Sequence, residues 1–162
     1  MEEKYFQYID SPVGWLKICT GKNALFAISF VNESGISSDK LPDILQKTVF
    51  QLQEYFDGKR QKFDLAVAPE GTDFQKKVWD LVNQVQFGEK ASYLDIAKLS
   101  GSEKNTRAVG LANGKNPIPI VIPCHRIVGS NGKLTGYAGG LERKRWLLRH
   151  EQKHSQNEQL LF

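Results

Sequence analysis

The sequence predicts an α/β protein in two parts: a small N-terminal layer of β-meander and helix, residues 1–69, and a mainly helical C-terminal domain, residues 70–162. Three observations predict this fold class. Short apolar runs separated by turn residues fill the first thirty positions. Capped amphipathic stretches follow Pro69-Glu70-Gly71, and a Pro-rich apolar segment at 116–128 interrupts them.

In the N-terminal part, three apolar runs bounded by turn signals are expected to be strands: Tyr5–Ile9, Trp15–Cys19 and Ala24–Val31. An amphipathic helix from Leu41 to Phe56 is expected to cover one face of them and to stop at Asp57-Gly58. A further strand is expected over Gln61–Ala68. This part contains no catalytic motif.

In the C-terminal part, two capping boxes predict helix starts: Thr72 with Gln75, and Ser92 with Asp95. A further helical stretch spans 103–113. The two short helices around Ser100-Gly101-Ser102 have the spacing of a helix-turn-helix, and an ordinary helical hairpin fits the pattern about equally well.

Composition and charge narrow the class of protein. Hydrophobic residues make up 40% and charged residues 25%, as in soluble globular proteins. No apolar run approaches the roughly 20 residues of a membrane span, and Met1–Lys4 lacks the pattern of a signal peptide. We therefore expect a cytoplasmic protein with no membrane partner, in which Cys19 and Cys124 are reduced thiols.

The charge is uneven along the chain. Residues 1–69 carry 8 Lys and Arg against 9 Asp and Glu, a net charge of −1, whereas residues 70–162 carry 14 against 9, a net charge of +5. Clustered positive charge favours a polyanion such as DNA. Taken alone, however, the charge fits simple solubility slightly better.

Cys124 is the candidate nucleophile. A free thiol, with a pKa near ~8.5, is only a few per cent thiolate at neutral pH, so a nucleophilic cysteine needs a base or positive surroundings. His125 and Arg126 offer both. If the backbone here is extended, adjacent side chains point to opposite faces, so a bend or a bridging water is needed between Cys124 and His125. Glu151 is the carboxylate expected to orient the imidazole, and Cys19 is expected only to pack on its strand.

A second motif, His150-Glu151-Gln152-Lys153-His154, fits the H-E-x-x-H pattern of zinc proteases. The match is short, its flanks are polar, and few residues follow that could supply a third ligand. We therefore do not expect a zinc protease, although a casual metal site formed by His150, His154 and a cysteine stays open as a minor alternative. The N-terminal layer has no cluster of Cys and His, so the overall expectation is no metal and no cofactor.

Several segments of the C-terminal part resemble the O6-alkylguanine-DNA alkyltransferases, also called methylated-DNA–protein-cysteine methyltransferases. The active-site signature is Ile120-Val121-Ile122-Pro123-Cys124-His125-Arg126-Ile127-Val128. Further similar segments are Arg107–Gly110, Asn116–Ile120, Gly136–Leu141 and Trp146–Glu151. The resemblance covers residues 70–151, and the N-terminal layer is similar only in outline.

This resemblance implies direct DNA repair by a suicidal, single-turnover methyltransferase. The Cys124 thiolate would take the alkyl group of O6-alkylguanine, with O4-alkylthymine as a second candidate substrate. His125, acting through a water, would remove the thiol proton while Glu151 orients the ring. Asn116 would brace the site, and Tyr93 would donate its phenol to the guanine. Groups expected to frame the base are the backbone of Cys124, Ile127 and Ala138 and the ring of Tyr137.

The resemblance also implies how DNA is bound. The lesion lies inside a duplex, so its nucleotide must be flipped out. The second helix of the helix-turn-helix would enter the minor groove, where Thr106 and Gly110 contact DNA, Arg107 fills the vacated stack and Tyr93 crowds the phosphate. We expect a monomer acting on double-stranded DNA.

Two alternatives and one minor prediction stand beside this interpretation. A non-catalytic helix-turn-helix protein that binds DNA or lesions would not need Cys124, and a cysteine hydrolase would need turnover. The tail, Gln159–Phe162, is a weak candidate for contact with a replication sliding clamp.

Overall fold

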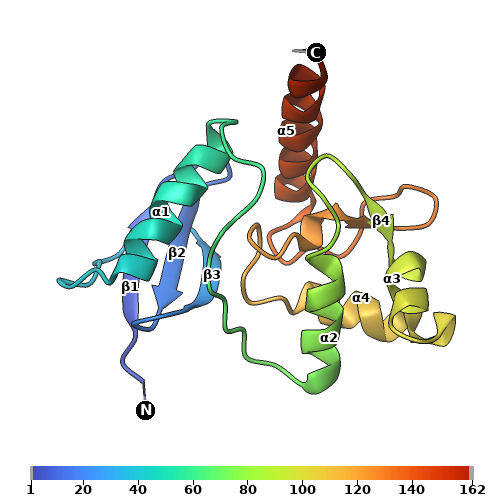
Figure 1. The fold of residues 1–162 in the computed structure, drawn as a ribbon, viewed down its shortest axis with the longest axis horizontal. Coiled ribbons are helices and arrows are strands. Elements are labelled where there is room, and N and C mark those ends of the chain that lie inside the picture. The colour runs from blue at the N-terminus through green and yellow to red at the C-terminus, as the bar shows by residue number, and fades with distance from the viewer. Residues whose placement is uncertain (1, 161–162) are drawn as a thin grey trace. The chain divides into compact units, whose positions relative to one another are not determined.

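The computed structural model describes residues 2–160, with side chains as far as Ser155. The tail predicted to contact a sliding clamp, Gln159–Phe162, lies outside the residues whose side chains are described. The chain forms two compact units, residues 1–70 and 71–162 (Figure 1). No helix in the described part of the chain is both long and apolar enough to cross a membrane.

The first unit is a three-stranded antiparallel meander with one helix. Strands β1 (Tyr5–Ile9), β2 (Trp15–Thr20) and β3 (Leu25–Val31) pair in sequence order, and α1 (Asp43–Phe56) packs against all three (Figure 1). Their shared core consists of fully buried apolar side chains: Leu16, Ile18, Leu25, Leu45, Leu52 and Tyr55. The predicted meander and covering helix are therefore confirmed.

The strand predicted over 61–68 is wrong. Only one isolated parallel bridge forms there, between Leu25 and Val67. At Asp64, both backbone groups bind the side-chain amide of Gln51. Gln51 Nε2 donates to the Asp64 carbonyl at 3.1 Å, and Oε1 accepts from the Asp64 N–H at 2.9 Å. Because a side chain takes these backbone groups, no strand ladder is needed to pair them.

The second unit is mainly helical. Its elements, in chain order, are α2 (Asp73–Val82), β4 (Ala91–Ser92), α3 (Tyr93–Leu99), the 3-10 turn η1 (Glu103–Asn105), α4 (Thr106–Gly114), the 3-10 turn η2 (Cys124–Arg126), β5 (Ile127–Val128) and α5 (Leu141–Leu160). Both predicted capping boxes are formed, at Thr72 and at Ser92. The parallel pair β4–β5 places Ser92 opposite Val128, so the start of α3 lies beside the segment that carries Cys124.

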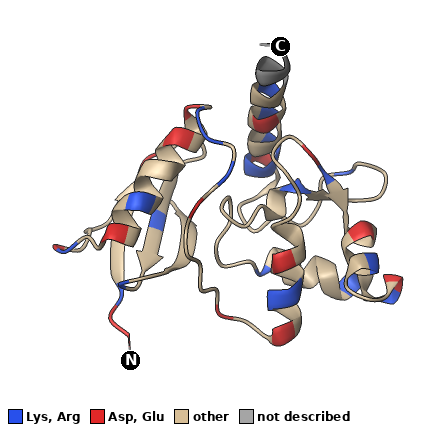
Figure 2. Ribbon diagram, viewed as in Figure 1, with Lys and Arg blue, Asp and Glu red and all other residues tan. Residues whose placement is uncertain are grey.

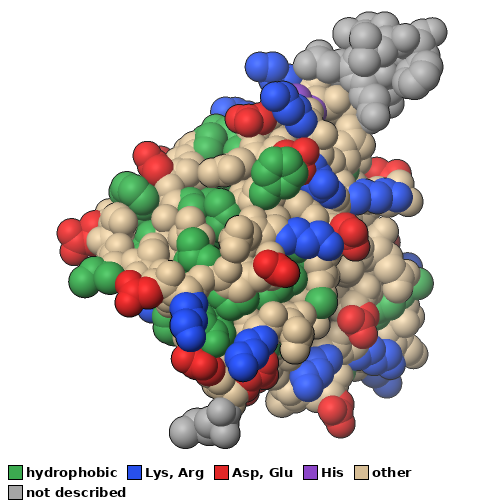
Figure 3. All heavy atoms as spheres, turned by 60° about the vertical axis from the view of Figure 1, so that its left-hand side comes forward, with side chains coloured by type: hydrophobic (Ala, Val, Ile, Leu, Met, Phe, Trp, Pro, Cys, Tyr) green, Lys and Arg blue, Asp and Glu red, His purple; other side chains and the backbone are tan. Residues whose placement is uncertain are grey.

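Helices α3 and α4 form the two helices of a helix-turn-helix arrangement. Two hydrogen bonds of the Ser100 hydroxyl stabilise the turn between them: it donates to the Ala97 carbonyl at 2.6 Å and accepts from the Asn105 side-chain amide at 3.0 Å. Basic and acidic positions alternate along the helices of this unit (Figure 2). On the face shown in Figure 3, hydrophobic and oppositely charged side chains are interspersed, so that face presents no field of a single sign.

Candidate active site

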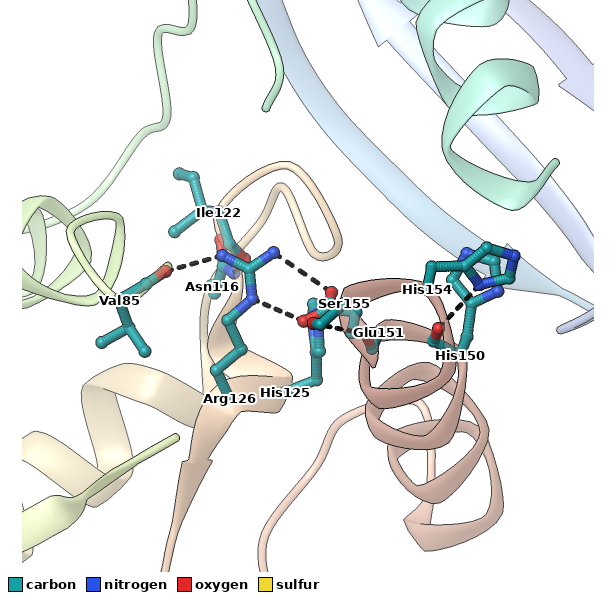
Figure 4. Close-up of polar contacts among 9 residues, drawn as sticks. All are labelled: Val85, Asn116, Ile122, His125, Arg126, His150, Glu151, His154 and Ser155. Carbon is teal, nitrogen blue, oxygen red and sulfur yellow. Dashed lines mark hydrogen bonds and ion pairs between the residues drawn. The ribbon is translucent and has the colours of Figure 1, made fainter. Parts of the chain in front are cut away.

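The Pro-rich segment is held by the amide of Asn116. Its Oδ1 accepts from the Ile118 N–H at 2.9 Å, and its Nδ2 donates to the Ile122 carbonyl at 2.8 Å (Figure 4). Between these two bonds Ile120 adopts a φ of 75°, a left-handed conformation that is unusual for a β-branched residue. Asn116 therefore closes the turn that carries the chain to Cys124.

Cys124, His125 and Arg126 lie in the 3-10 turn η2, and not in an extended segment as considered from the sequence. The Arg126 N–H donates to the Pro123 carbonyl at 3.0 Å, and the Cys124 N–H donates to the Ile122 carbonyl at 2.8 Å. In a 3-10 turn successive side chains are rotated by about 120°, and they do not alternate between two faces. The geometric objection to cooperation between Cys124 and His125 is thereby removed.

The Cys124 thiol is buried, with 4% of the residue exposed. Burial raises the pKa of the Cys124 thiol to about 11, although a hydrogen bond from Asn116, the charge of Lys144 and the backbone N–H groups of the turn lower it in part. The resting thiol is therefore protonated at neutral pH. A nucleophilic Cys124 needs a base that takes this proton.

His125, the residue after Cys124 in the same turn, is the candidate base, and it is paired with Glu151 of α5. His125 Nε2 lies 2.6 Å from Glu151 Oε2, and both side chains are buried (Figure 4). A carboxylate accepts a proton but does not offer one, so Nε2 carries the hydrogen and Nδ1 is the basic nitrogen. Nδ1 is buried and has no hydrogen-bond partner among the described residues.

Glu151 also binds Arg126, which donates from Nε to Oε1 at 2.7 Å and from Nη2 to Oε2 at 3.1 Å. Burial alone would raise the pKa of the Glu151 carboxyl, but the charges and hydrogen bonds of His125 and Arg126 hold that pKa well below its usual range. The carboxylate is therefore charged at all physiological pH values.

Tyr93 lies at the start of α3 beside this site. Its phenol donates to the Thr135 carbonyl at 3.0 Å, and its ring is 3.8 Å from where a side chain on Gly110 of α4 would begin. A phenol that donates to a guanine must therefore first leave Thr135. The structure therefore places the Tyr93 ring against α4 and its hydroxyl beside Thr135 and Lys144.

Lys144 of α5 is a site residue that the sequence reasoning missed. It is fully buried, and its Nζ donates to the carbonyls of Ile127 at 2.6 Å and Thr135 at 2.8 Å. Burial lowers the pKa of Lys144 to about 8, opposed by its attraction to the Cys124 thiolate. One signal could have found it: Lys144 shares a helical face with Leu147 and Glu151, at spacings of three and seven residues.

The remaining residues predicted to frame the base differ in exposure. Ile127 and Tyr137 are buried, whereas Ala138 is exposed. The Cys124 carbonyl accepts from the Asn113 side chain at 3.2 Å, and the Ile127 carbonyl accepts from Lys144. Each carbonyl has a second lone pair, so these bonds leave acceptor capacity for another donor.

The predicted DNA-contacting residues lie on α4. Arg107 is exposed, and Thr106 and Gly110 are partly exposed. Leu111, one turn after Arg107, is 64% exposed, which is unusual for a leucine in a folded unit. This face of α4 is therefore available to a partner.

The H-E-x-x-H residues point in different directions. Glu151 turns toward Arg126, whereas the His150 and His154 rings lie together on another side of α5 (Figure 4). The His150 ring stacks on Trp146 with centroids 4.8 Å apart, and His154 Nδ1 lies 2.9 Å from the His150 carbonyl. No group of three or more potential metal ligands occurs within the described part of the chain.

Comparisons with known proteins identify the family. Residues 4–69 match the model of the 6-O-methylguanine DNA methyltransferase, ribonuclease-like domain, and residues 73–153 match that of the 6-O-methylguanine DNA methyltransferase, DNA binding domain. The methylated-DNA–protein-cysteine methyltransferase of Methanosarcina acetivorans is 42% identical over 154 residues, covering 91% of this chain and 97% of that protein. Its counterpart from Mycolicibacterium paratuberculosis is 40% identical over 161 residues, covering 97% and 98%.

Solved structures agree. The crystal structure of Mycobacterium tuberculosis O6-methylguanine methyltransferase superimposes with a TM-score of 0.85 at 39% identity, covering 94% of both chains. The M. tuberculosis OGT in complex with DNA gives a TM-score of 0.84 at 41% identity, covering 92% of this chain and 93% of that one.

The fold and the site define a class: a helix-turn-helix unit of DNA-binding type that encloses a cysteine beside a histidine and a carboxylate. Within that class, this chain belongs to the 6-O-methylguanine DNA methyltransferase family. The predicted family, the α/β fold class and the assignment to DNA alkyl repair are confirmed. The alternative of a non-catalytic binding protein is not favoured.

Proposed function

We propose that this protein repairs duplex DNA by transferring the alkyl group of O6-alkylguanine to Cys124 in a single turnover. The observation that carries the proposal is the buried turn η2, where Cys124 adjoins His125 and its partner Glu151. The match of residues 73–153 to the DNA-binding domain of the family supports DNA as the partner.

The chemistry follows from the geometry. A water carries the Cys124 proton to His125 Nδ1, whose ring is oriented by the bond from Nε2 to Glu151. The thiolate then attacks the alkyl carbon, a carbon–sulfur bond forms, and the electron pair of the broken carbon–oxygen bond stays on the guanine. Tyr93 exchanges its bond to Thr135 for a bond to the guanine and stabilises the charge that develops there. The thioether is stable, so the protein acts once.

DNA engagement is assigned to α4. The exposed Arg107 fills the stack vacated by the flipped nucleotide, while Thr106 and Gly110 let the helix approach the minor groove. Ile127, Tyr137 and Ala138 frame the base, and Asn116 keeps the turn in place. O4-alkylthymine presents a similar alkyl ether and is a second candidate substrate.

The proposed reaction bears on the location and the oligomeric state of the protein. It consumes a reduced thiol, which favours the cytoplasm. A monomer suffices, because Cys124, His125 and Glu151 all belong to the second unit. The sliding-clamp contact of residues 159–162 is a separate proposal, tested by truncating those four residues and measuring clamp binding, which should fall.

Mass spectrometry of the tryptic peptides tests the transfer. Incubation with an excess of duplex DNA containing O6-methylguanine should add one methyl group to the peptide of Cys124 and none to that of Cys19. Lesion loss should stop at one equivalent per protein. A Cys124→Ser variant should bind the same DNA and remove no methyl. An unmodified Cys124, or many lesions processed per protein, would contradict the proposal.

A further inference from the structure

Arg126 is held on several sides inside the second unit. Its side chain is 7% exposed. Besides its two bonds to Glu151, it donates from Nη1 to the Val85 carbonyl at 2.6 Å (Figure 4). The guanidinium also lies 5.8 Å from the ring centroid of Phe87. A planar guanidinium with hydrogen bonds on several sides has little freedom to rotate, so the charge of Arg126 stays beside the Glu151 carboxylate.

The Glu151 carboxylate is consequently shared between two donors. Oε2 accepts from both His125 and Arg126, while Oε1 accepts from Arg126. A buried carboxylate requires a compensating cation. If His125 were the sole partner, that cation would have to be the imidazolium. Since a guanidinium is always protonated, Arg126 already supplies the charge.

This charge balance matters for His125. The neutral ring donates from Nε2 to Glu151 and keeps the lone pair of Nδ1, the nitrogen that has no partner among the described residues. An imidazolium would have a proton on both nitrogens and could not accept the thiol proton.

The other groups around His125 do not replace Arg126. From α5, Lys144 acts on the Cys124 thiolate, and the loop before α5 contributes the neutral phenol of Tyr137. The buried residues of α2, which packs on η2, are Val78, Trp79 and Val82, and these carry no charge. Arg126 is therefore a permanently charged group in direct contact with Glu151.

We propose that Arg126 is a positioning residue that keeps His125 an unprotonated base, by neutralising and fixing the Glu151 carboxylate. The inference rests on the proposed function of Cys124. Before the reaction the cluster holds one negative carboxylate, one positive guanidinium, a neutral ring and a thiol. After the proton moves through a water from sulfur to Nδ1, the ring is positive and the sulfur negative. The net charge of these four groups is zero at both stages, so no proton need reach the solvent.

The pH profile of thiol alkylation tests this inference on the full chain without DNA. Iodoacetamide transfers its carboxamidomethyl group to sulfur and releases iodide, and the Cys124 peptide is quantified by mass spectrometry between pH 6 and 9. The wild type should show a shallow profile, because the thiol proton stays inside the cluster. Arg126→Met leaves the Glu151 carboxylate without its guanidinium partner, so on this inference the imidazole no longer takes the thiol proton, which must leave to solvent. The rate should be lower at pH 7 and should rise about tenfold per pH unit.

Two variants separate charge from packing. Arg126→Lys keeps the positive charge but loses the two-nitrogen contact of the guanidinium with Glu151. Cys124 of this variant should therefore react more slowly than in wild type while the pH profile stays shallow. If Arg126 only held the structure together, the lysine variant would show the steep profile of the methionine variant. Arg149→Met removes an exposed arginine of the same helix as Glu151 and should match wild type. Should Arg126→Met fail to fold, the lysine profile decides: shallow supports the inference, and steep overturns it.

Methyl transfer from O6-methylguanine DNA, measured in parallel, distinguishes the two proposals. If wild type transfers no methyl while the iodoacetamide profiles differ as expected, the proposed function fails and the role of Arg126 in thiol activation stands. If wild type transfers methyl but its own profile is steep, or Arg126→Met is as shallow as wild type, the inference about Arg126 is overturned.

Discussion

At the scale of single residues, the buried ionisable groups near the Cys124 sulfur have pKa values shifted in different directions. Burial raises the pKa of Cys124 and lowers that of Lys144, while ion pairing holds that of Glu151 low. The thiol therefore keeps its proton while its surroundings carry the charges that stabilise a thiolate. Separated ionisation preferences of this kind are typical of sites that transfer a proton before a nucleophilic step.

Lys144→Met should slow methyl transfer by about tenfold, because one positive charge close to the thiolate is lost. It should also change the pH dependence of stability. Between about pH 8 and the usual lysine pKa of 10.5, the unfolded wild type binds a proton that the folded state lacks. The free energy of unfolding of wild type minus that of Lys144→Met should therefore rise with pH across this window. Urea unfolding of both proteins at pH 7, 8, 9 and 10 measures it, and a constant difference would contradict the assignment.

At the scale of elements, the site depends on how α5 is seated. Glu151 and Lys144 both project from α5, and the loop before α3 approaches the same helix at Gly88 and Ser155.

Local signals predicted some elements well: both capping boxes form where Thr72 and Ser92 predict them. Non-local contacts decided the rest. The strand expected at 61–68 was lost because Gln51, distant in sequence, takes the Asp64 backbone, which no local pattern encodes.

Gly88→Ala should destabilise the protein and slow methyl transfer. Gly88 has a φ of 82°, and a side chain there would overlap the hydroxyl of Ser155, which donates to the Glu151 carbonyl at 2.8 Å. Strain and displacement of α5 together should cost more than about 1 kcal/mol. Gly132→Ala is the matched control, since its φ is 79° but nothing lies within 4 Å of the added carbon. It should lose stability from backbone strain alone and keep its transfer rate, whereas equal transfer rates in the two variants would rule out the clash.

Gly110→Ala should separate stability from DNA binding. Alanine stabilises a helix interior by about 1 kcal/mol relative to glycine, and the added carbon would lie 3.8 Å from the Tyr93 ring, an ordinary contact. Thermal unfolding should therefore shift upward. If α4 enters the minor groove, the methyl group should weaken binding to duplex DNA, as fluorescence anisotropy would show. Unchanged affinity with raised stability would mean that this face of α4 does not meet DNA.

At the scale of the whole molecule, the sequence predicted the family and offered Cys124 as the candidate nucleophile, but it did not indicate every residue that surrounds Cys124. The run from Ile120 to Val128 singled out Cys124 and His125 as candidates, and the structure brings Glu151 into contact with His125 as expected. Lys144 was missed because a lysine among the basic residues of α5 resembles a solvated charge until the helix is packed. The sequence did not indicate that His125 and Arg126 share Glu151, because that arrangement depends on the 3-10 turn, in which adjacent side chains do not alternate between opposite faces.

The charge distribution gives the last prediction. Residues 70–162 carry a net charge of +5 and match the DNA-binding domain of the family, whereas residues 1–69 carry −1. Affinity for undamaged duplex DNA should therefore fall steeply with salt, because phosphate contacts release counterions. Anisotropy titrations between 50 and 200 mM salt should give a straight line of log affinity against log salt concentration.

Lys104→Ala, which removes an exposed charge beside α4, should reduce the slope by about 1 if Lys104 contacts a phosphate. Arg107→Ala should instead weaken methyl transfer more than binding, because its proposed place is within the base stack. A salt-independent affinity would show that the positive excess serves solubility alone.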